Sequence, residues 1–436
     1  MQTGFSATQL ADPDTAHAEQ VLRRCVHCGF CTATCPTYVL LGDELDSPRG
    51  RIALIKNMLE AGESPSADTV KHIDRCLSCL SCVTTCPSGV DYMHLIDHGR
   101  RFVEEHYRRP WGERALRRLL ASVLMRPSRF RRALALARLG RSSAPLLPSR
   151  LKPLLSLAPV AVPKRSPMDR PQMFLAEGKR RMRVALLPGC AQTVLRPSIN
   201  EATIRLLCRH GCEVVIPRGA SCCGSLVHHL GRQDEALAHA RATIDAFERE
   251  RSERGLDAIV ANASGCGTTL KDYGFMLRGD SAYAEQAARV SGLARDVSEV
   301  IAALGLRPPS KEGVRLRVAY HSPCSLQHGQ RLHKEPKALL AAAGFEAIEV
   351  AEGHLCCGSA GTYNLLQPEI ADRLRERKLA HIGALEPDCV AAGNIGCIVQ
   401  LEKGSPAPVL HTVELLDWAT GGPPPPALAS KIGRRP

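Results

Sequence analysis

Short apolar runs alternate with stretches of helical periodicity in the C-terminal half of the chain. In the first round, buried strands are predicted at residues 183–190, 212–216 and 257–261, with helices between them at about 197–210 and 233–253. The second round repeats the pattern, with strands predicted at residues 318–324 and 389–392. Each round closes with a similar helix, which starts near Val297 and near Val413. Strand and helix alternation of this kind predicts parallel α/β layers.

Cysteines follow these predicted strands at matching places in both rounds. The first set is Cys190, Cys222, Cys223 and Cys266, and the second is Cys324, Cys356, Cys357 and Cys397. The first three pairs are each 134 residues apart and the fourth pair is 131 residues apart, so the two rounds form an internal repeat. Ligand sites in parallel α/β sheets collect beyond the carboxyl ends of the strands. We therefore expect each set to meet at a site of its own, which makes two sites.

The N-terminal part of the chain predicts helices. A first helix is expected near residues 15–24. Apolar positions recur at helical spacing between residues 52 and 59, with Ser47 as an N-cap, Pro48 at the first helical position and Gly62 at the C-cap. The apolar face of this second helix is expected to cover the cysteine runs on either side of it.

Between these parts, residues 100–183 are rich in Arg, Leu, Ala and Pro. They hold 22 Lys and Arg against five Asp and Glu, an excess larger than the +13 of the whole chain. We interpret them as a basic amphipathic helical arm followed by a proline-rich linker. A solvated spacer and a docking surface for an acidic membrane or partner subunits both remain open. Nucleic acid is disfavoured because the arm has almost no aromatic residues for stacking on bases.

Two cysteine runs dominate the chemistry of the N-terminal part. Both have the spacing C-x2-C-x2-C-x3-C-P, which is the signature of a [4Fe–4S] ferredoxin module in which the fourth cysteine of each run binds the other cluster. The first cluster is accordingly assigned to Cys25, Cys28, Cys31 and Cys86. The second cluster is assigned to Cys76, Cys79, Cys82 and Cys35.

Zinc and disulfides are the alternatives for these runs. Structural zinc prefers two separated C-x2-C pairs, whereas three cysteines here crowd into seven residues. Disulfide frameworks belong to short secreted chains, while this chain has 436 residues and its first 20 show no apolar signal-peptide core. The 19 cysteines are therefore interpreted as metal ligands of a cytoplasmic protein. The sequence contains no run of about 18 apolar residues, so we predict no membrane-spanning helix.

The cysteines of the two later sets also suggest metal binding. Four thiols at matching strand ends, flanked by glycines that admit a bulky ligand, favour an iron–sulfur or zinc site over redox-active or merely buried cysteines. Cys208, Cys212 and Cys389 have no counterpart in the other round and are expected in the core. His321 and His354 are either hydrogen-bond donors to such a site or ordinary loop histidines.

Paired ferredoxin runs followed by two Cys-Cys-Gly units resemble a known group of iron–sulfur subunits. The group comprises those of glycolate oxidase, anaerobic glycerol-3-phosphate dehydrogenase, lactate utilisation and heterodisulfide reductase. The segments 47–52, 76–92 and 356–364 are most similar to the glycolate oxidase (glycolate dehydrogenase) iron–sulfur subunits. The resemblance covers residues from about 20 to 420.

One departure from the group concerns the last cysteine of each unit. Heterodisulfide reductase subunits of this kind end each unit with a C-x2-C pair, but residues 267–269 and 398–400 contain no second thiol after Cys266 and Cys397. A double-cubane-like cluster is therefore in doubt, and a four-thiolate site or no site at all are the open outcomes.

The resemblance implies an electron-transfer subunit of an oxidoreductase. Electrons would come from FAD on separate dehydrogenase subunits and leave towards quinone or another acceptor, during oxidation of glycolate or D-lactate to the 2-oxo acid. The chain itself shows no dinucleotide-binding glycine motif and no acid–base constellation, so FAD and substrate oxidation are expected elsewhere. The expected cofactors are two [4Fe–4S] clusters and further iron–sulfur in the Cys-Cys-Gly domains. The expected location is the cytoplasm, in peripheral contact with the inner face of the membrane.

Several rival functions remain. The chain could serve glycerol-3-phosphate or lactate dehydrogenase in the same manner, or act as a heterodisulfide-reductase-like thiol enzyme. A cluster-containing nucleic-acid binder is the rival from another class, but no nucleic acid is expected.

The sequence thus predicts an α+β multidomain chain. The expected parts are a helical ferredoxin domain (1–99), a basic arm and linker (100–183), a first Cys-Cys-Gly α/β domain (184–310), a second one (311–422) and a tail (423–436).

Overall fold

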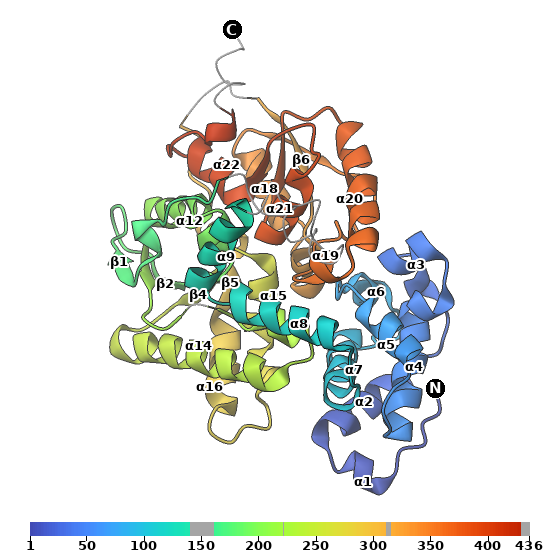
Figure 1. Ribbon diagram of the computed structural model, residues 1–436. Helices are drawn as coiled ribbons and strands as arrows, with labels where there is room; N and C mark the ends of the chain where they lie inside the picture. The colour runs from blue at the N-terminus through green and yellow to red at the C-terminus, as the bar shows by residue number, and fades with distance from the viewer. Residues whose placement is uncertain (140–160, 221, 311–314, 429–436) are drawn as a thin grey trace.

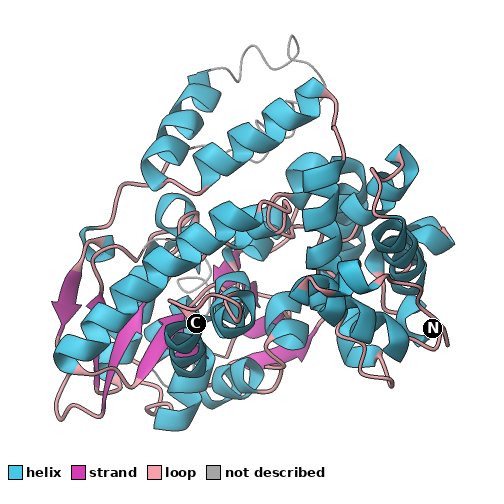
Figure 2. Ribbon diagram, turned by 90° about the horizontal axis from the view of Figure 1, so that it is seen from below, coloured by secondary structure: helices cyan, strands magenta, loops and turns pink. Residues whose placement is uncertain are grey.

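The computed structural model describes residues 1–139, 161–220, 222–310 and 315–428, which form a helical part followed by two α/β parts (Figure 1). Residues 1–139 contain helices and loops and no strand. The predicted order of a helical module and two α/β domains is confirmed. Figure 2 shows that the region around the N-terminus contains only helices and loops.

The N-terminal part consists of seven α-helices and two short 3-10 turns. They are α1 (Ala7–Leu10), α2 (Pro13–Arg24), η1 (Phe30–Thr32), α3 (Pro36–Leu41), η2 (Glu44–Asp46), α4 (Pro48–Ala61), α5 (Ala67–Asp74), α6 (Ser81–Thr85) and α7 (Tyr92–His106). The expected caps of α4 are confirmed, because the Ser47 side chain accepts a hydrogen bond from the Gly50 amide and Gly62 adopts φ +66°. Ile52, Ile55 and Leu59 of α4 are buried in the core of this part.

Two further helices follow, α8 (Trp111–Leu124) and α9 (Pro127–Leu139), and they pack against each other. Arg109 fixes the start of α8 through ion pairs with Asp74 at 2.6 Å and Glu113 at 2.7 Å. The predicted basic helical arm is therefore present. The linker that follows it falls largely on residues 140–160, which lie outside the described residues.

The first α/β part contains a five-stranded sheet in the order β1-β3-β2-β4-β5. Its elements are η5 (Pro167–Asp169), β1 (Gln172–Phe174), β2 (Met182–Leu186), α11 (Gln192–Leu195), α12 (Ser198–Arg209), β3 (Cys212–Ile216), α13 (Ser225–His228), α14 (Gln233–Arg254), β4 (Ala258–Ala261), α15 (Ser264–Met276), α16 (Ala284–Leu293), β5 (Ala294–Asp296) and α17 (Val297–Leu304). Strands β2 to β5 run parallel, while β1 pairs antiparallel with β3 at the edge. The sequence did not predict β1 or β5, which are only three residues long.

The second α/β part contains a parallel four-stranded sheet in the order β7-β6-β8-β9. Its elements are β6 (Arg317–Tyr320), the π-turn η6 (Ser325–Gly329), α18 (Glu335–Ala342), β7 (Glu346–Glu349), α19 (Tyr363–Leu366), α20 (Pro368–Gly383), β8 (Cys389–Ala392), α21 (Ile395–Glu402), β9 (Val409–His411), α22 (Thr412–Ala419) and η7 (Pro426–Leu428). Strand β8 has the predicted bounds. Both sheets therefore contain the same central trio of parallel strands, as the internal repeat requires.

The two α/β parts share a continuous apolar core. Val184 and Leu207 of the first part and Val318 and Leu416 of the second belong to one buried cluster. At the contact between α12 and α22, the buried Asp417 carboxylate forms ion pairs with Arg205 at 2.7 Å and with Arg209 at 2.9 Å. The two repeats are thus packed into one body, which sets how their strand ends face each other.

Candidate metal centres

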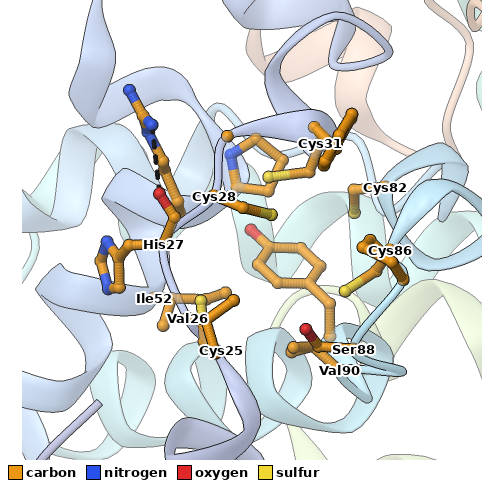
Figure 3. Close-up of a pocket in the computed structure, with 16 residues that line it drawn as sticks. Cys25, Val26, His27, Cys28, Cys31, Ile52, Cys82, Cys86, Ser88 and Val90 are labelled. Carbon is orange, nitrogen blue, oxygen red and sulfur yellow. Dashed lines mark hydrogen bonds between the residues drawn. The ribbon is translucent and has the colours of Figure 1, made fainter.

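The first predicted ligand set lies in two loops of the helical part. Cys25 caps the end of α2, Cys31 lies in η1, and Cys86 caps the end of α6. His27 and Gly29 adopt φ +55° and +88°, which turns the loop between them back on itself. Figure 3 shows the sulfurs of this set around a common space. The cysteines that line this space are Cys25, Cys28, Cys31, Cys82 and Cys86.

This first set is the more exposed of the two ferredoxin sets. Cys28 is exposed, and Cys31 and Cys86 are half-buried. Burial raises the pKa of the Cys31 thiol to about 11. The apolar side chains of Val26 and Phe30 on either side of Cys28 are 68% and 65% exposed. A cofactor held here would lie close to the protein surface.

The second ligand set is fully buried and lies deeper in the molecule. Burial, followed by the nearby thiols of Cys79, Cys76 and Cys35, raises the pKa of Cys82 well above its ordinary value. Cys35 therefore lies with the cysteines of the other run, as expected from the exchange of the fourth ligand. The structure brings together Cys35, Cys76, Cys79 and Cys82.

A buried guanidinium faces the second set. Arg51 is 1% exposed, and its Nη1 points to the Cys35 sulfur at 3.8 Å. Its other nitrogens donate to the His72 carbonyl at 2.7 Å and to Asp46 Oδ1 at 3.1 Å. Tyr92 adds a hydroxyl that donates to the Cys76 sulfur at 3.7 Å. Donors of this kind stabilise negative charge on ligand sulfurs.

All eight cysteines of the two later sets line one cavity of about 280 Å³. They are Cys190, Cys222, Cys223, Cys266, Cys324, Cys356, Cys357 and Cys397. The sequence predicted two separate sites, but the carboxyl ends of both sheets face the same space, so the two sets become neighbours. The tandem repeat fixes which cysteines group together, whereas the packing of the two halves decides whether the groups meet.

The thiols within each set are in contact. The sulfurs of Cys324 and Cys356 lie 3.8 Å apart. Interaction with Cys356 and burial raise the pKa of Cys324 well above its ordinary value, and Cys222 together with burial does the same for Cys190. Such thiols ionise only where a cation compensates their charge. A soft metal ion or iron–sulfur cluster, which requires thiolate ligands, supplies that compensation.

The glycine of each Cys-Cys-Gly unit permits this crowding. Gly224 and Gly358 adopt φ of +86° and +90°, and a Cβ on either would collide with the backbone of Ala236 or Ala371. A side chain at these positions would push the cysteine doublet away from the long helix behind it. The motif therefore requires glycine for both its backbone angle and its packing.

A buried histidine and a buried lysine lie next to the cysteines of the second half of the cavity. The donor atoms of His321, Cys357 and Cys397 lie within 4.8 Å of one another. Burial and then Lys378 lower the pKa of His321 to about 3. Lys378 Nζ donates to the Glu352 carbonyl at 2.6 Å, and burial lowers its pKa despite the nearby thiols. The sequence singled out His321 but gave no reason to notice Lys378, which lies within a helical run.

The second ferredoxin set adjoins this cavity. Cys79 and Leu77 share a buried apolar cluster with Cys356 and Tyr363. Burial, followed by Cys324, raises the pKa of Cys79, so these two thiols interact electrostatically. The Tyr363 hydroxyl also donates to the Arg75 carbonyl at 3.0 Å, which ties the two parts together at this point. The helical part thus touches the second Cys-Cys-Gly unit directly.

Helices α8 and α9 cover the opposite side of the cavity. Leu124, Phe130 and Leu134 from these helices line it. Arg131 anchors α9 by donating to the Thr193 carbonyl at 2.5 Å beside Cys190. The apolar face of the predicted arm is therefore used inside the molecule, while Arg118, Arg129 and Arg132 are exposed. The arm is part of the site and not a free spacer.

A histidine and aspartate cluster joins the helical part to the first α/β part. His94 lies between Asp91 Oδ2 at 2.6 Å and Asp272 Oδ1 at 2.8 Å, and its ring stacks on Phe275. Burial lowers the pKa of His94, but the two carboxylates outweigh it and raise the value to about 9. His228 adds a contact to Asp97 at 3.2 Å. Sequence reasoning missed this cluster, because His94 and Asp272 are 178 residues apart and match no ligand spacing.

The three cysteines without a repeat counterpart lie elsewhere. Cys208, Cys212 and Cys389 are buried in the core shared by the two α/β parts. None of them lines the cavity.

The donor sets fit the predicted cofactors. Each ferredoxin set offers four thiols, which is the ligand number of a [4Fe–4S] cluster. Each later set offers four thiols as well, and the second adds an imidazole, so both suit iron–sulfur or zinc.

Comparison with known families supports this chemistry. The family model of the 4Fe-4S dicluster domain matches residues 21–90, and that of the cysteine-rich domain matches residues 184–271 and 318–402. Iron–sulfur clusters of the [4Fe–4S] type are thereby confirmed as the cofactors of the helical part. The assignment of individual cysteines stays a prediction.

Curated relatives span nearly the whole chain. The glycolate oxidase iron–sulfur subunit of Escherichia coli is 43% identical over 96% of this chain and 99% of that protein. A probable glycolate oxidase iron–sulfur subunit of Bacillus subtilis is 33% identical over 88% of this chain and 89% of that protein. Lactate utilization protein A of Geobacillus thermodenitrificans is 25% identical over 54% of this chain and 99% of its own length. Among the described residues, no helix is both long and apolar enough to cross a membrane.

Proposed function

The chain belongs to the family of glycolate oxidase iron–sulfur subunits, and we propose that it is the electron-transfer subunit of a complex that oxidises glycolate or D-lactate to the 2-oxo acid. The substrate is oxidised on a partner subunit that carries FAD, and electrons leave through this chain towards quinone. The observation that carries the proposal is the succession of cysteine sets from the surface at Cys28, through the buried second set, to the cavity at Cys324 and Cys356.

Eight cysteines are proposed to hold the two [4Fe–4S] clusters. Cys25, Cys28, Cys31 and Cys86 hold one cluster, and Cys35, Cys76, Cys79 and Cys82 hold the other. The grouping of Cys86 with the first run and of Cys35 with the second supports this assignment. When bound, each cluster would accept and donate one electron at a time.

The surroundings of the two cysteine sets suggest a different role for each set. The exposed side chains of Val26 and Phe30 flank the first set and offer an apolar surface to a partner subunit. Arg51 and Tyr92 donate hydrogen bonds to sulfurs of the second set and hold its negative charge in a buried place. The partner's flavin is therefore proposed to approach the first set. The cluster in the second set is proposed to pass electrons towards the cavity.

The Cys-Cys-Gly cavity is proposed to hold a metal centre near the exit. Its thiols come from both halves, and the apolar side chains of Leu124, Phe130 and Leu134 shield it from water. A shielded site of this kind keeps a reduced centre from reacting with solvent oxidants. Contact with the membrane is proposed to be peripheral and to use the basic outer face of α8 and α9, where Trp111 is exposed.

An assay of the reconstituted complex tests the proposal. With the flavoprotein partner, we expect glycolate to reduce both a dye that accepts electrons from flavin and a soluble quinone. Replacement Cys356→Ser should leave dye reduction intact and lower quinone reduction at least tenfold. Replacement Cys208→Ala serves as the control, because Cys208 is buried in the core away from the cavity.

Two results would contradict the proposal. Glycolate oxidation by the purified chain alone, with any acceptor, would place the substrate chemistry on this chain. Unchanged quinone reduction in Cys356→Ser would remove the cavity from the route.

A further inference from the structure

His321 has two buried ring nitrogens without a partner. Its side chain is 2% exposed, and neither Nδ1 nor Nε2 makes a hydrogen bond. A buried polar group left unpaired lowers the stability of the folded state. Native proteins rarely keep such groups unless a ligand, water or functional role accounts for them. The imidazole therefore requires an explanation beyond packing.

The position of the ring points to that explanation. His321 follows β6, Cys357 lies in the loop after β7, and Cys397 lies in the first turn of α21, so three separate segments converge here. Their donor atoms lie within 4.8 Å of one another. The His321 amide donates to the Ala391 carbonyl at 2.9 Å, which extends the pairing of β6 with β8 and holds the residue in place. A nitrogen beside two thiols is a common donor set for zinc and for iron.

The first half of the molecule lacks this imidazole. The offset of 134 residues that relates three of the cysteine pairs places Leu187 at the position of His321. Leu187 is buried and carries no donor atom. At this position the two sites therefore differ in one side chain.

A second difference lies on the long helix behind each doublet. Gly358 faces Ala371 and Gly224 faces Ala236, so Lys378, seven residues after Ala371, corresponds to Thr243, seven residues after Ala236. Lys378 is buried near the thiols of its own half, whereas Thr243 is neutral. A lysine in this place can balance the negative charge of thiolates that bind a metal.

We propose that His321 is a ligand of the metal centre in the second half of the cavity, together with Cys357 and Cys397. The inference rests on the proposed function, which assigns a metal to this cavity. The two halves then hold unlike centres, one with thiolates alone and one with thiolates and an imidazole. Exchange of thiolate for histidine raises the reduction potential of iron–sulfur centres. The second half, which adjoins Cys79, thus becomes the favoured place for electrons to arrive.

The test uses the full chain, prepared without oxygen and labelled with ¹⁵N in the histidine rings. In the native chain, electron–nuclear double resonance of the reduced centre should show a directly coordinated imidazole nitrogen. If the metal is zinc, the same nitrogen should appear in X-ray absorption at the zinc edge. Replacement His321→Leu copies Leu187 of the first half, so the variant is expected to fold. It should lose the nitrogen signal and at least half of the metal in this centre, with the iron of the ferredoxin clusters unchanged.

Two further variants sharpen the result. His321→Cys should restore the metal without the nitrogen signal, because a thiol replaces the ring. His354→Leu is the matched control, since His354 lies two residues before Cys356 but outside the converging donor set. It should leave both readouts unchanged.

A nitrogen signal that survives in His321→Leu, or that is absent from the native chain, would overturn the proposal. Replacement Cys357→Ser separates this failure from that of the proposed function. Loss of metal in Cys357→Ser but not in His321→Leu would mean that a centre exists and His321 does not bind it. Full metal content in both variants would mean that this half holds no centre at all.

Discussion

Arg51 shows how one side chain conditions a cluster site. Its guanidinium is buried, donates to the His72 carbonyl and to Asp46, and faces the sulfur of Cys35. Asp46 balances part of its charge and is held in turn by His72 and Arg75. The positive charge close to Cys35 is expected to favour the reduced, more negative state of the cluster that this cysteine is proposed to hold.

Removal of the Arg51 charge should lower that potential. In Arg51→Gln we expect the potential of the second cluster to fall by about 60 mV, which is about a tenfold change in the equilibrium constant for one electron. Arg51→Lys keeps the charge and should show a smaller fall. Lys56→Gln, on the same helix but in a half-buried ion pair with Glu60, should have no effect. Redox titration followed by EPR measures all three, and an unchanged potential in Arg51→Gln would disprove this role.

Single residues were predictable where chemistry fixes their spacing. The cysteine runs alone predict that Cys35 binds the second cluster and Cys86 the first, because each closing cysteine reaches the other cluster, and this assignment stays a prediction. The role of Arg51 depends on Asp46 and His72, which come from a turn and from the end of another helix. No local pattern marks such a contact, so the sequence left it unnoticed.

At the scale of elements, α7 joins the helical part to the first α/β part. Its His94 ring is held between Asp91 and Asp272. The two carboxylates raise its pKa to about 9, above the ordinary value of 6.5. A raised pKa means that the contact contributes its full stability below about pH 6.5 and loses it as the pH rises through 9. The contribution has an upper bound of about 3 kcal/mol.

Replacement His94→Gln should therefore destabilise the chain in a pH-dependent manner. Thermal unfolding without oxygen should show a clear loss at pH 6 and a much smaller loss at pH 9.5, because the native imidazolium has by then lost its proton. His106→Gln, near the exposed end of the same helix, should change little at either pH. Equal losses at both pH values would show that the ion pair does not stabilise this contact.

Helices α8 and α9 illustrate what helix periodicity can and cannot reveal. Alternating Leu and Arg residues predicted two amphipathic helices, and both are present. The same pattern suits a spacer, a membrane-binding arm or a cover for a cavity. Here Phe130 and Leu134 line the cavity, so the apolar face packs against other parts of the same chain. Only the tertiary contacts distinguish between these interpretations.

At the scale of the whole molecule, three bodies meet around the Cys-Cys-Gly cavity. The repeat in the sequence predicted two α/β units with four cysteines each. It did not predict that α12 and α22 pack the two units into one core, which brings both cysteine sets to the same space. It also gave no sign that the helical part docks with Cys79 beside Cys356. Relative orientation depends on contacts between the parts, such as those of the buried Asp417, which carry no periodic signal.

The most direct test of the central claim is to measure iron and acid-labile sulfide per chain. The protein is prepared without oxygen, and EPR of its reduced state is recorded alongside. The two ferredoxin clusters account for about eight irons. We predict metal beyond this amount and an added signal, or an altered relaxation of the second cluster, that disappears in Cys357→Ser. About eight irons, with spectra that Cys357→Ser leaves unchanged, would contradict a continuous path from the ferredoxin clusters into the cavity.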